Sequence, residues 1–249
     1  MSASSFIDRN DQTDKSHPNY EPLGLTDFSL EEGSLSQDPQ YWLSQNIPSS
    51  LLRHQAAAKA RGADYPGAIA ILTHLIKQNP ISAIDYNNRG LMYFLNSETD
   101  KALADCERAI ELNPALAAAY NNRANCYAAQ GELTKALEDY DLAIDLNPLN
   151  FRAVINQGIT LRQLGLYDWA IENFDRALIL GQLEGYIYTQ RGRTHHLAGD
   201  WNCAIADYRR AIAAADQPTP LPLDLKCPWR SLAKTWMNQL LSIANKSSL

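Results

Sequence analysis

A repeat of 34 residues constrains the fold of this chain more than any other feature of its sequence. Asn-Pro pairs lie at 79–80, 113–114 and 147–148, each 34 residues after the previous one. Alanines keep the same interval over five units, at Ala68, Ala102, Ala136, Ala170 and Ala204. A third series contains only small residues, Ala56, Gly90, Ala124, Gly158 and Gly192. Self-similarity at a fixed period of this length is typical of stacked helical units that share one continuous core.

Each unit has room for two amphipathic helices. Apolar and small residues recur at helical intervals over 83–95 and again over 103–112. Between the two helices one position is repeatedly glycine, at Gly131, Gly165 and Gly199. A left-handed residue there can end the first helix and reverse the chain. The first full unit lacks this glycine, so we expect Asn96 to adopt the left-handed turn and 97–100 to form a capping box. The proline after each asparagine should end the second helix.

These positions resemble the signature of the tetratricopeptide repeat (TPR) family. Alignment by the prolines gives five repeats, at 49–82, 83–116, 117–150, 151–184 and 185–218. The second and third match every signature position, with Tyr86 and Tyr120 as the leading aromatics, whereas Gln182 and Asp216 replace proline in the last two. The resemblance implies an all-α fold, a right-handed superhelical array of five TPR helix pairs. A proline linker and a C-terminal capping helix are expected to follow in 219–249.

The first 48 residues differ from the rest in net charge, in amino-acid composition and in their lack of helical periodicity. They contain eight Asp and Glu against two Lys and Arg, which accounts for the whole net charge of -6. They are rich in Ser, Asp, Asn and Pro and lack periodicity, so we expect a mostly flexible acidic N-terminal tail. Its aromatic stretch 39–43 can dock on the first repeat or on a partner. The tail as a whole can also dock within the molecule.

The composition limits the cellular locations and the classes of binding partner that we expect for this chain. The chain has no run of eighteen apolar residues and no basic start followed by an apolar run, so we expect no membrane span, no secretory signal and a cytoplasmic location. The acidic net charge argues against nucleic acid as a partner. The cysteines are far apart and form no CxxC pair, which favours free thiols: Cys106, Cys126, Cys203 and Cys227.

In TPR proteins the first helix of each pair lines a concave groove, and the resemblance places a series of amides there. The sixth position of the repeats reads His54, Asn88, Asn122, Asn156 and Gln190. An amide both donates and accepts a hydrogen bond, so a ladder of amides can pair with the backbone of an extended peptide. The other inward-facing candidates are Asn87, Asn121, Asn125, Arg152, Arg162 and Arg193. The arginines predict a partly acidic ligand. A hydrated helix face remains the alternative interpretation of the amides.

Three tryptophans are candidates for a secondary interface. Trp169 falls on the predicted convex side, where an exposed tryptophan can anchor a partner. Trp229 and Trp236 share the apolar face of the last helix. That helix is expected to cap the array, and a dimerisation helix is the alternative.

Two further groups of residues have structural explanations. Arg89, Arg123 and Arg191 recur at the seventh position, and we expect them to pair with carboxylates such as Asp105 and Asp139. His195, His196, Asp200 and Cys203 lie close in sequence. They could form a metal or nucleophile site, but His195 takes an aromatic position of the repeat and is expected to pack instead.

The sequence therefore predicts a binding protein. It contains no glycine-rich phosphate loop, HExxH or GxSxG motif, so we expect no catalytic residues, no cofactor and no metal. The leading hypothesis is a non-enzymatic scaffold or assembly factor that holds an extended, partly acidic segment of another protein in its groove. The alternative is a structural oligomerisation module that uses the convex face or the last helix.

Overall fold

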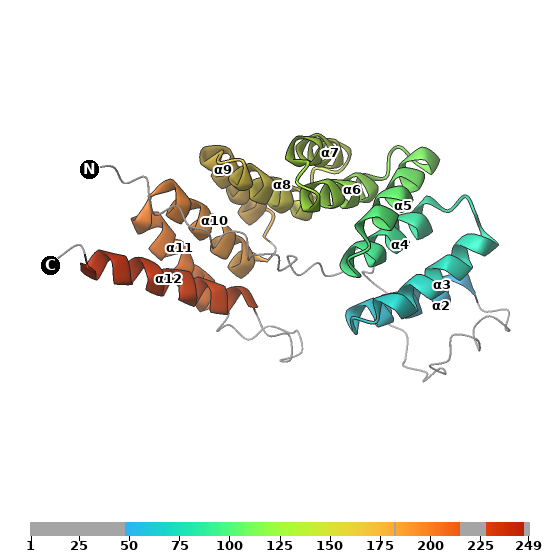
Figure 1. Cartoon of the computed structure of the whole chain (residues 1–249), viewed down its shortest axis with the longest axis horizontal. Helices are drawn as coiled ribbons and strands as arrows, with labels where there is room; N and C mark the ends of the chain where they lie inside the picture. The colour runs from blue at the N-terminus through green and yellow to red at the C-terminus, as the bar shows by residue number, and fades with distance from the viewer. Residues whose placement is uncertain (1–47, 182, 215–227, 247–249) are drawn as a thin grey trace. The chain divides into compact units, whose positions relative to one another are not determined.

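The computed structural model describes residues 48–181, 183–214 and 228–246, and these form helices without any strand (Figure 1). The helices are α2 (Ser49–Arg61), α3 (Tyr65–Gln78), α4 (Ala83–Leu95), α5 (Thr99–Leu112), α6 (Ala117–Ala129), α7 (Leu133–Leu146), α8 (Phe151–Gln163), α9 (Tyr167–Ile179), α10 (Glu184–Ala198), α11 (Trp201–Ala214) and α12 (Pro228–Lys246). This confirms the predicted all-α class. The acidic tail, with its aromatic stretch 39–43, and most of the proline linker lie outside the described residues.

The chain divides into two compact units, and the first, Met1–Pro114, contains α2 to α5. Helices α2 and α3 form one antiparallel pair, α4 and α5 form the next, and α3 packs against α4. Apolar side chains from three of the helices share one cluster that includes Leu52, Leu72, Leu75, Leu91 and Met92. A bidentate ion pair joins Arg53 of α2 to Asp85 of α4, with N–O distances of 2.7 and 2.8 Å.

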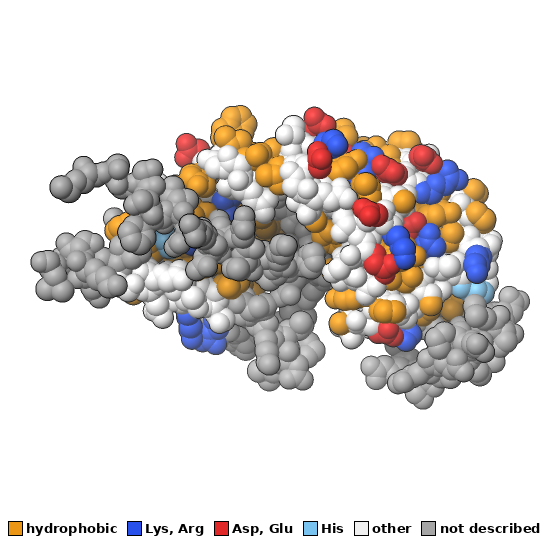
Figure 2. Space-filling view, viewed as in Figure 1, with side chains coloured by type: hydrophobic (Ala, Val, Ile, Leu, Met, Phe, Trp, Pro, Cys, Tyr) orange, Lys and Arg blue, Asp and Glu red, His pale blue; other side chains and the backbone are white. Residues whose placement is uncertain are grey.

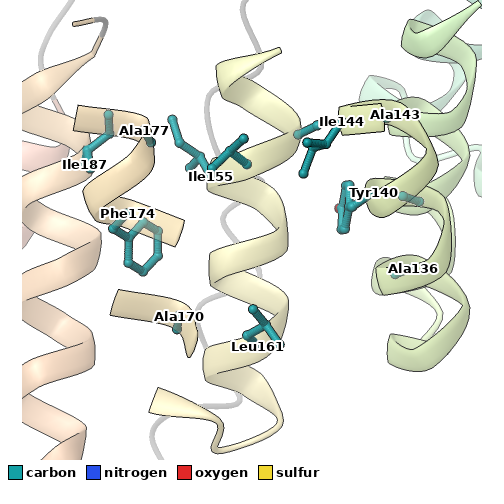
Figure 3. Close-up of a cluster of buried hydrophobic side chains, with 13 residues drawn as sticks. Ala136, Tyr140, Ala143, Ile144, Ile155, Leu161, Ala170, Phe174, Ala177 and Ile187 are labelled. Atoms are coloured by element: carbon teal, nitrogen blue, oxygen red, sulfur yellow. The ribbon is translucent and has the colours of Figure 1, made fainter. Parts of the chain in front are cut away.

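The second unit, Ala115–Leu249, contains three helix pairs and α12. The pairs α6/α7, α8/α9 and α10/α11 follow one another, and α12 packs on both α10 and α11. In the central core, Tyr140 of α7, Ile155 of α8, Phe174 of α9 and Ile187 of α10 pack in sequence (Figure 3). A second cluster joins α11 to α12 through residues such as Leu240.

The turn between the two helices of a pair contains a left-handed residue at the same position in all five repeats. A left-handed residue recurs at intervals of 34, with positive φ at Ala63, Ser97, Gly131, Gly165 and Gly199. The prediction for the first full unit was therefore wrong by one residue, because Asn96 has φ -86° and Ser97 has φ 63°. The capping box is absent as well. Glu98 is the N-cap of α5 and makes no side-chain cap bond, since its carboxylate accepts from Asn96 and pairs with Lys101 instead.

The second helices end as the Asn-Pro pairs predicted. Asn79, Asn113 and Asn147 are the C-caps of α3, α5 and α7, with φ between -146° and -135° and ψ near 90°. This is the extended region to which a following proline restricts a residue. Helix α9 lacks the proline and ends differently, with left-handed residues at Gly181 (φ 70°) and Leu183 (φ 57°).

Buried arginine–aspartate ion pairs join the two helices of a repeat, as the sequence predicted. Arg89 binds Asp105 and Arg123 binds Asp139, each through two bonds of 2.7 and 2.8 Å. The fifth repeat has the equivalent pair, in which Arg191 binds Asp207. In each case one guanidinium satisfies both oxygens of a carboxylate that is nearly inaccessible to solvent. Such bidentate geometry is what makes a buried carboxylate tolerable.

The small-residue positions allow close helix contact within each pair. At Gly158 a Cβ would lie 3.1 Å from the Phe174 ring, and at Gly192 it would lie 2.9 Å from Tyr208. Larger side chains there would push the paired helices apart. Within the described part of the chain, no helix combines the length and the apolar character that a membrane crossing requires.

Candidate peptide-binding face

The residues predicted to bind a peptide lie on the first helices of the repeats. Asn87 and Asn88 are on α4 in the first unit. The remaining eight are on α6, α8 and α10 of the second unit: Asn121, Asn122, Asn125, Arg152, Asn156, Arg162, Gln190 and Arg193. Helix α8 contacts both α6 and α10, so these eight residues belong to three neighbouring helices.

The amides of α6 and α8 form one hydrogen-bonded network. Asn156 donates its Nδ2–H groups to Asn125 Oδ1 at 3.0 Å and to Asn121 Oδ1 at 3.5 Å. Tyr140, on α7, donates its hydroxyl to the same Asn125 oxygen at 2.7 Å. Asn121 donates in turn to Asn122 Oδ1 at 3.2 Å, and Asn87 and Asn88 repeat that contact at 3.3 Å. The amides are therefore fixed in orientation by one another.

These amides expose little surface. Asn122, Asn156 and Gln190 have only 6 to 7% of their area accessible, whereas Asn88 is half-buried. A peptide backbone would have to compete with the hydrogen bonds that Asn122 Oδ1, Asn156 Nδ2 and Gln190 Oε1 already make. Because such an exchange replaces one neutral hydrogen bond by another, each amide can add at most about 0.5 to 1.5 kcal/mol to binding. The amides position this face more than they attract a ligand.

The arginines supply the electrostatic character of the face. Arg162 of α8 donates from Nη1 to Gln190 of α10, at 2.8 Å to Oε1 and 3.2 Å to the backbone oxygen. The guanidinium of Arg193 lies 5.0 Å from the centre of the Trp236 ring, and that of Arg152 lies 5.4 Å from the Phe151 ring. All three arginines are half-buried. A guanidinium in a partly dry setting attracts a carboxylate more strongly than one in open water.

Two titratable groups register this positive potential. Burial and the charge of Arg193 together lower the pKa of His196 to about 4, so its ring is neutral at pH 7. Burial raises the pKa of the Tyr208 phenol, while Arg193 and Arg162 act in the opposite direction. The Tyr208 hydroxyl lies 3.4 Å from His196 Nδ1. Both arginines therefore lie close enough to act on the same phenol, and their charges reinforce each other at that point.

The tryptophans divide into one exposed ring and two packed rings. Trp169 has 66% of its area accessible, and Figure 2 shows apolar side chains at the surface over α9. Trp229 lies directly against Gly185, where a Cβ would overlap its ring. Trp236 packs on Tyr208 with 6.2 Å between ring centres. The two tryptophans of α12 thus contact α10 and α11, which is the contact a capping helix makes.

Two further features lie outside the predicted binding residues, and the sequence raised only the second of them, as a metal or nucleophile site set aside in favour of packing. A shallow hollow of about 190 Å³ is lined by Pro148, Val154, Arg176, Ile179 and Leu180, none of which was predicted to bind a ligand. The available signal in the sequence was the apolar run 177–180 at the end of α9. The second feature is a cluster of His195, Asp200 and Cys203, whose side-chain ligand atoms lie within 4.8 Å of one another.

Paired helices, the repeated left-handed turn and the small packing positions together define a helical-repeat protein. Two models of the tetratricopeptide repeat match this chain, one at residues 83–116 and 117–150 and the other at 155–218. The chain belongs to the tetratricopeptide repeat family, and the resemblance seen in its sequence is confirmed. Proteins of this family are generally non-enzymatic protein-interaction modules, so membership supports a protein-interaction scaffold.

Solved structures agree with this fold. TTC0263, a thermophilic TPR protein of Thermus thermophilus, is 19% identical with a TM-score of 0.64, over 74% of this chain and 98% of that chain. MamA is 19% identical with a TM-score of 0.55, over 70% of this chain and 98% of that chain. At such identities the likeness shows the fold alone.

Proposed function

We propose that this protein is an interaction scaffold or assembly factor that holds an extended, partly acidic segment of another protein on the face formed by α6, α8 and α10. The observation that carries the proposal is the pair of half-buried guanidinium groups on neighbouring helices, that of Arg162 held by Gln190 and that of Arg193 held over the Trp236 ring. The amide network of Asn121, Asn125 and Asn156 supports the proposal, because it holds α6 and α8 in register beside these arginines.

The arginines dominate the expected affinity. A hydrogen bond to a charged group contributes about 1.5 to 3 kcal/mol, roughly twice the value for a neutral amide. Gln190 fixes the Arg162 guanidinium through two acceptors, so less rotamer freedom is lost when a ligand binds. A ligand carboxylate near Arg162 and Arg193 should therefore fix the register of the peptide, and backbone contacts to the amides should add to it.

Fluorescence anisotropy tests the proposal with a short labelled peptide in which glutamate alternates with alanine, and a matched peptide with glutamine in place of glutamate. Arg162→Gln and Arg193→Gln should each weaken binding of the acidic peptide at least about tenfold, because one charge-assisted bond of about 1.5 to 3 kcal/mol is lost. Arg209→Gln is the control, since Arg209 is exposed on α11. Equal binding of the two peptides, or an unchanged affinity in the double variant, would refute the proposal.

The acidic N-terminal tail offers a competitor for the same face. Residues 1–48 carry a net charge of -6, and we propose that they occupy the arginine face when no partner is bound. Deletion of 1–48 should then raise the affinity for the acidic peptide without changing that for the glutamine peptide. An equal affinity in the full and shortened chains would reject this competition and leave the binding face itself intact.

The exposure of Trp169 favours a second candidate, an oligomerisation module that uses the surface of α9. Light scattering separates the two functions. A Trp169-mediated oligomer should lose mass on Trp169→Ala, whereas a groove binder should keep its mass.

A further inference from the structure

The turn between α10 and α11 brings together three side chains that can bind a metal ion. His195 lies near the end of α10, Asp200 precedes α11 and Cys203 lies in its first turn. One ligand atom from each falls within 4.8 Å of the other two. His195 is partly buried, while Asp200 and Cys203 are exposed. The sequence assigned His195 to packing, but its ring nitrogen faces a carboxylate.

Backbone contacts hold this turn in place. Gly199 is left-handed at φ 86°, and the Asp200 N–H donates to the His195 carbonyl at 2.9 Å. Asp200 Oδ1 accepts from the Cys203 N–H at 3.2 Å and so caps α11. Its other oxygen, Oδ2, lies 3.7 Å from His195 Nδ1. The carboxylate is therefore fixed by one oxygen and offers the second toward the imidazole.

The same turn holds a lysine in the first three repeats. Lys59 pairs with Asp64 at 2.7 Å, Lys101 with Glu98 at 2.5 Å and Lys135 with Glu132 at 3.3 Å. In the second and third repeats the ammonium also lies over an aromatic ring, that of Tyr93 or Tyr127, at 5.4 and 5.6 Å. A carboxylate, a ring and a cation thus occupy this turn together.

The fifth repeat keeps the carboxylate and replaces the other two groups by metal ligands. His195 stands where the second and third repeats have Tyr93 and Tyr127, and Cys203 stands where they have Lys101 and Lys135. Asp200 takes the place of the glutamate. We propose that this turn binds a zinc ion through His195, Asp200 and Cys203, so that a metal cation takes the role that lysine has in the earlier repeats.

The ligand set and its spacing suit zinc. One imidazole nitrogen, one carboxylate oxygen and one thiolate are typical zinc donors, and tetrahedral bonds of about 2.0 to 2.3 Å place such donors roughly 3.3 to 3.6 Å apart. The 3.7 Å between His195 Nδ1 and Asp200 Oδ2 is close to this separation. The fourth position would be open to water or to a donor from a partner.

The surrounding charges permit a divalent cation. Arg191, one turn before His195, is already paired with both Asp207 and Asp175. The Asp200 carboxylate raises the pKa of the Cys203 thiol, so zinc must displace the thiol proton as it binds. One carboxylate and one thiolate then balance the two positive charges of zinc.

Cobalt absorption tests the site on the untagged full-length protein. Addition of Co²⁺ should produce a thiolate charge-transfer band in the near ultraviolet that saturates at one equivalent, and Zn²⁺ should displace it. Cys203→Ser should abolish the band. Asp200→Asn keeps a residue that caps a helix well. It should weaken metal binding at least tenfold, because even the loss of a residue that only hydrogen-bonds a metal ligand costs about 10-fold to 100-fold in affinity. Cys227→Ser is the matched control and should keep the band.

A band that requires Cys203 and is weakened by Asp200→Asn supports the site. No band in the wild-type protein overturns it, and so does a band that persists in Cys203→Ser. If Cys203→Ser loses helical circular dichroism, His195→Tyr replaces it, because the second and third repeats carry tyrosine at that position. That variant should also lose metal affinity while it keeps the fold.

Discussion

Removal of the Trp236 ring should destabilise the end of the second unit without changing the mass of the protein. Trp236 contacts Tyr208 at 6.2 Å and the Arg193 guanidinium at 5.0 Å. Together with Trp229, it belongs to the cluster that joins α12 to α11. If α12 caps the array, Trp236→Ala exposes the apolar surface of α10 and α11 within one molecule.

The contacts of the ring set the size of the effect. Truncation of a buried tryptophan to alanine typically costs about 3 to 5 kcal/mol. Trp236 is only partly buried, so we expect about 2 to 3 kcal/mol, of which the aromatic pair with Tyr208 supplies roughly 0.5 to 1.5. Trp169→Ala is the matched control, because Trp169 is 66% exposed and should cost under about 0.5 kcal/mol.

Urea unfolding measures the loss in the free energy of unfolding, hydrogen exchange locates it along the chain, and light scattering measures the mass. A capping helix predicts faster exchange in α11 and α12, a lower unfolding midpoint and an unchanged mass. A dimerisation helix predicts a mass that falls by half and monomer stability close to that of the wild type. The second pattern would refute the assignment of Trp236 to an intramolecular contact.

Two further predictions follow from the turns and from the buried histidine. Gly131→Ala should lower the free energy of unfolding by about 1 kcal/mol, because alanine pays the left-handed penalty at φ 81° while its Cβ meets no atom within 4 Å, and Ala63→Gly should not be destabilising. Equal urea midpoints for Gly131→Ala and wild type would contradict this. His196 has a native pKa of about 4, below its unfolded value of about 6.5, so the native state binds fewer protons between these values. The contribution of neutral His196 to the free energy of unfolding should be fully present above pH 6.5 and should be lost as the pH falls toward 4. His196→Gln should therefore make the free energy of unfolding less dependent on pH over this range. An equal pH dependence in the two proteins would show that His196 is not its cause.

The sequence predicts the elements of this fold well because its repeat reports backbone requirements directly. A proline favours extended backbone for the asparagine before it, and Asn79, Asn113 and Asn147 end their helices in that conformation. The arginine–aspartate pairs were also predictable, since residues 16 apart recur at matched positions on the two helices of a pair. Ser97 was missed because a statistical preference for asparagine favoured its neighbour. The 34-residue register, applied strictly, selects Ser97 as the equivalent of Gly131.

The candidate site was less predictable, because its properties depend on contacts between repeats. The sequence places Asn122 and Asn156 on first helices, but it does not show that Asn156 binds Asn125 and Asn121. At the position of His195, the 34-residue repeat indicates only that the residue is large. Size favours packing, whereas the direction of its ring toward Asp200 depends on the left-handed turn at Gly199.

The open space around the inter-helix turns makes them natural attachment points. A Cβ at Gly131, Gly165 or Gly199 would meet no atom within 4 Å, so added chain there would extend into solvent. Exposed turns of this kind tolerate inserted sequence best. A fluorophore or an epitope tag carried at one of them would label a chosen repeat of the protein while its helices remain undisturbed.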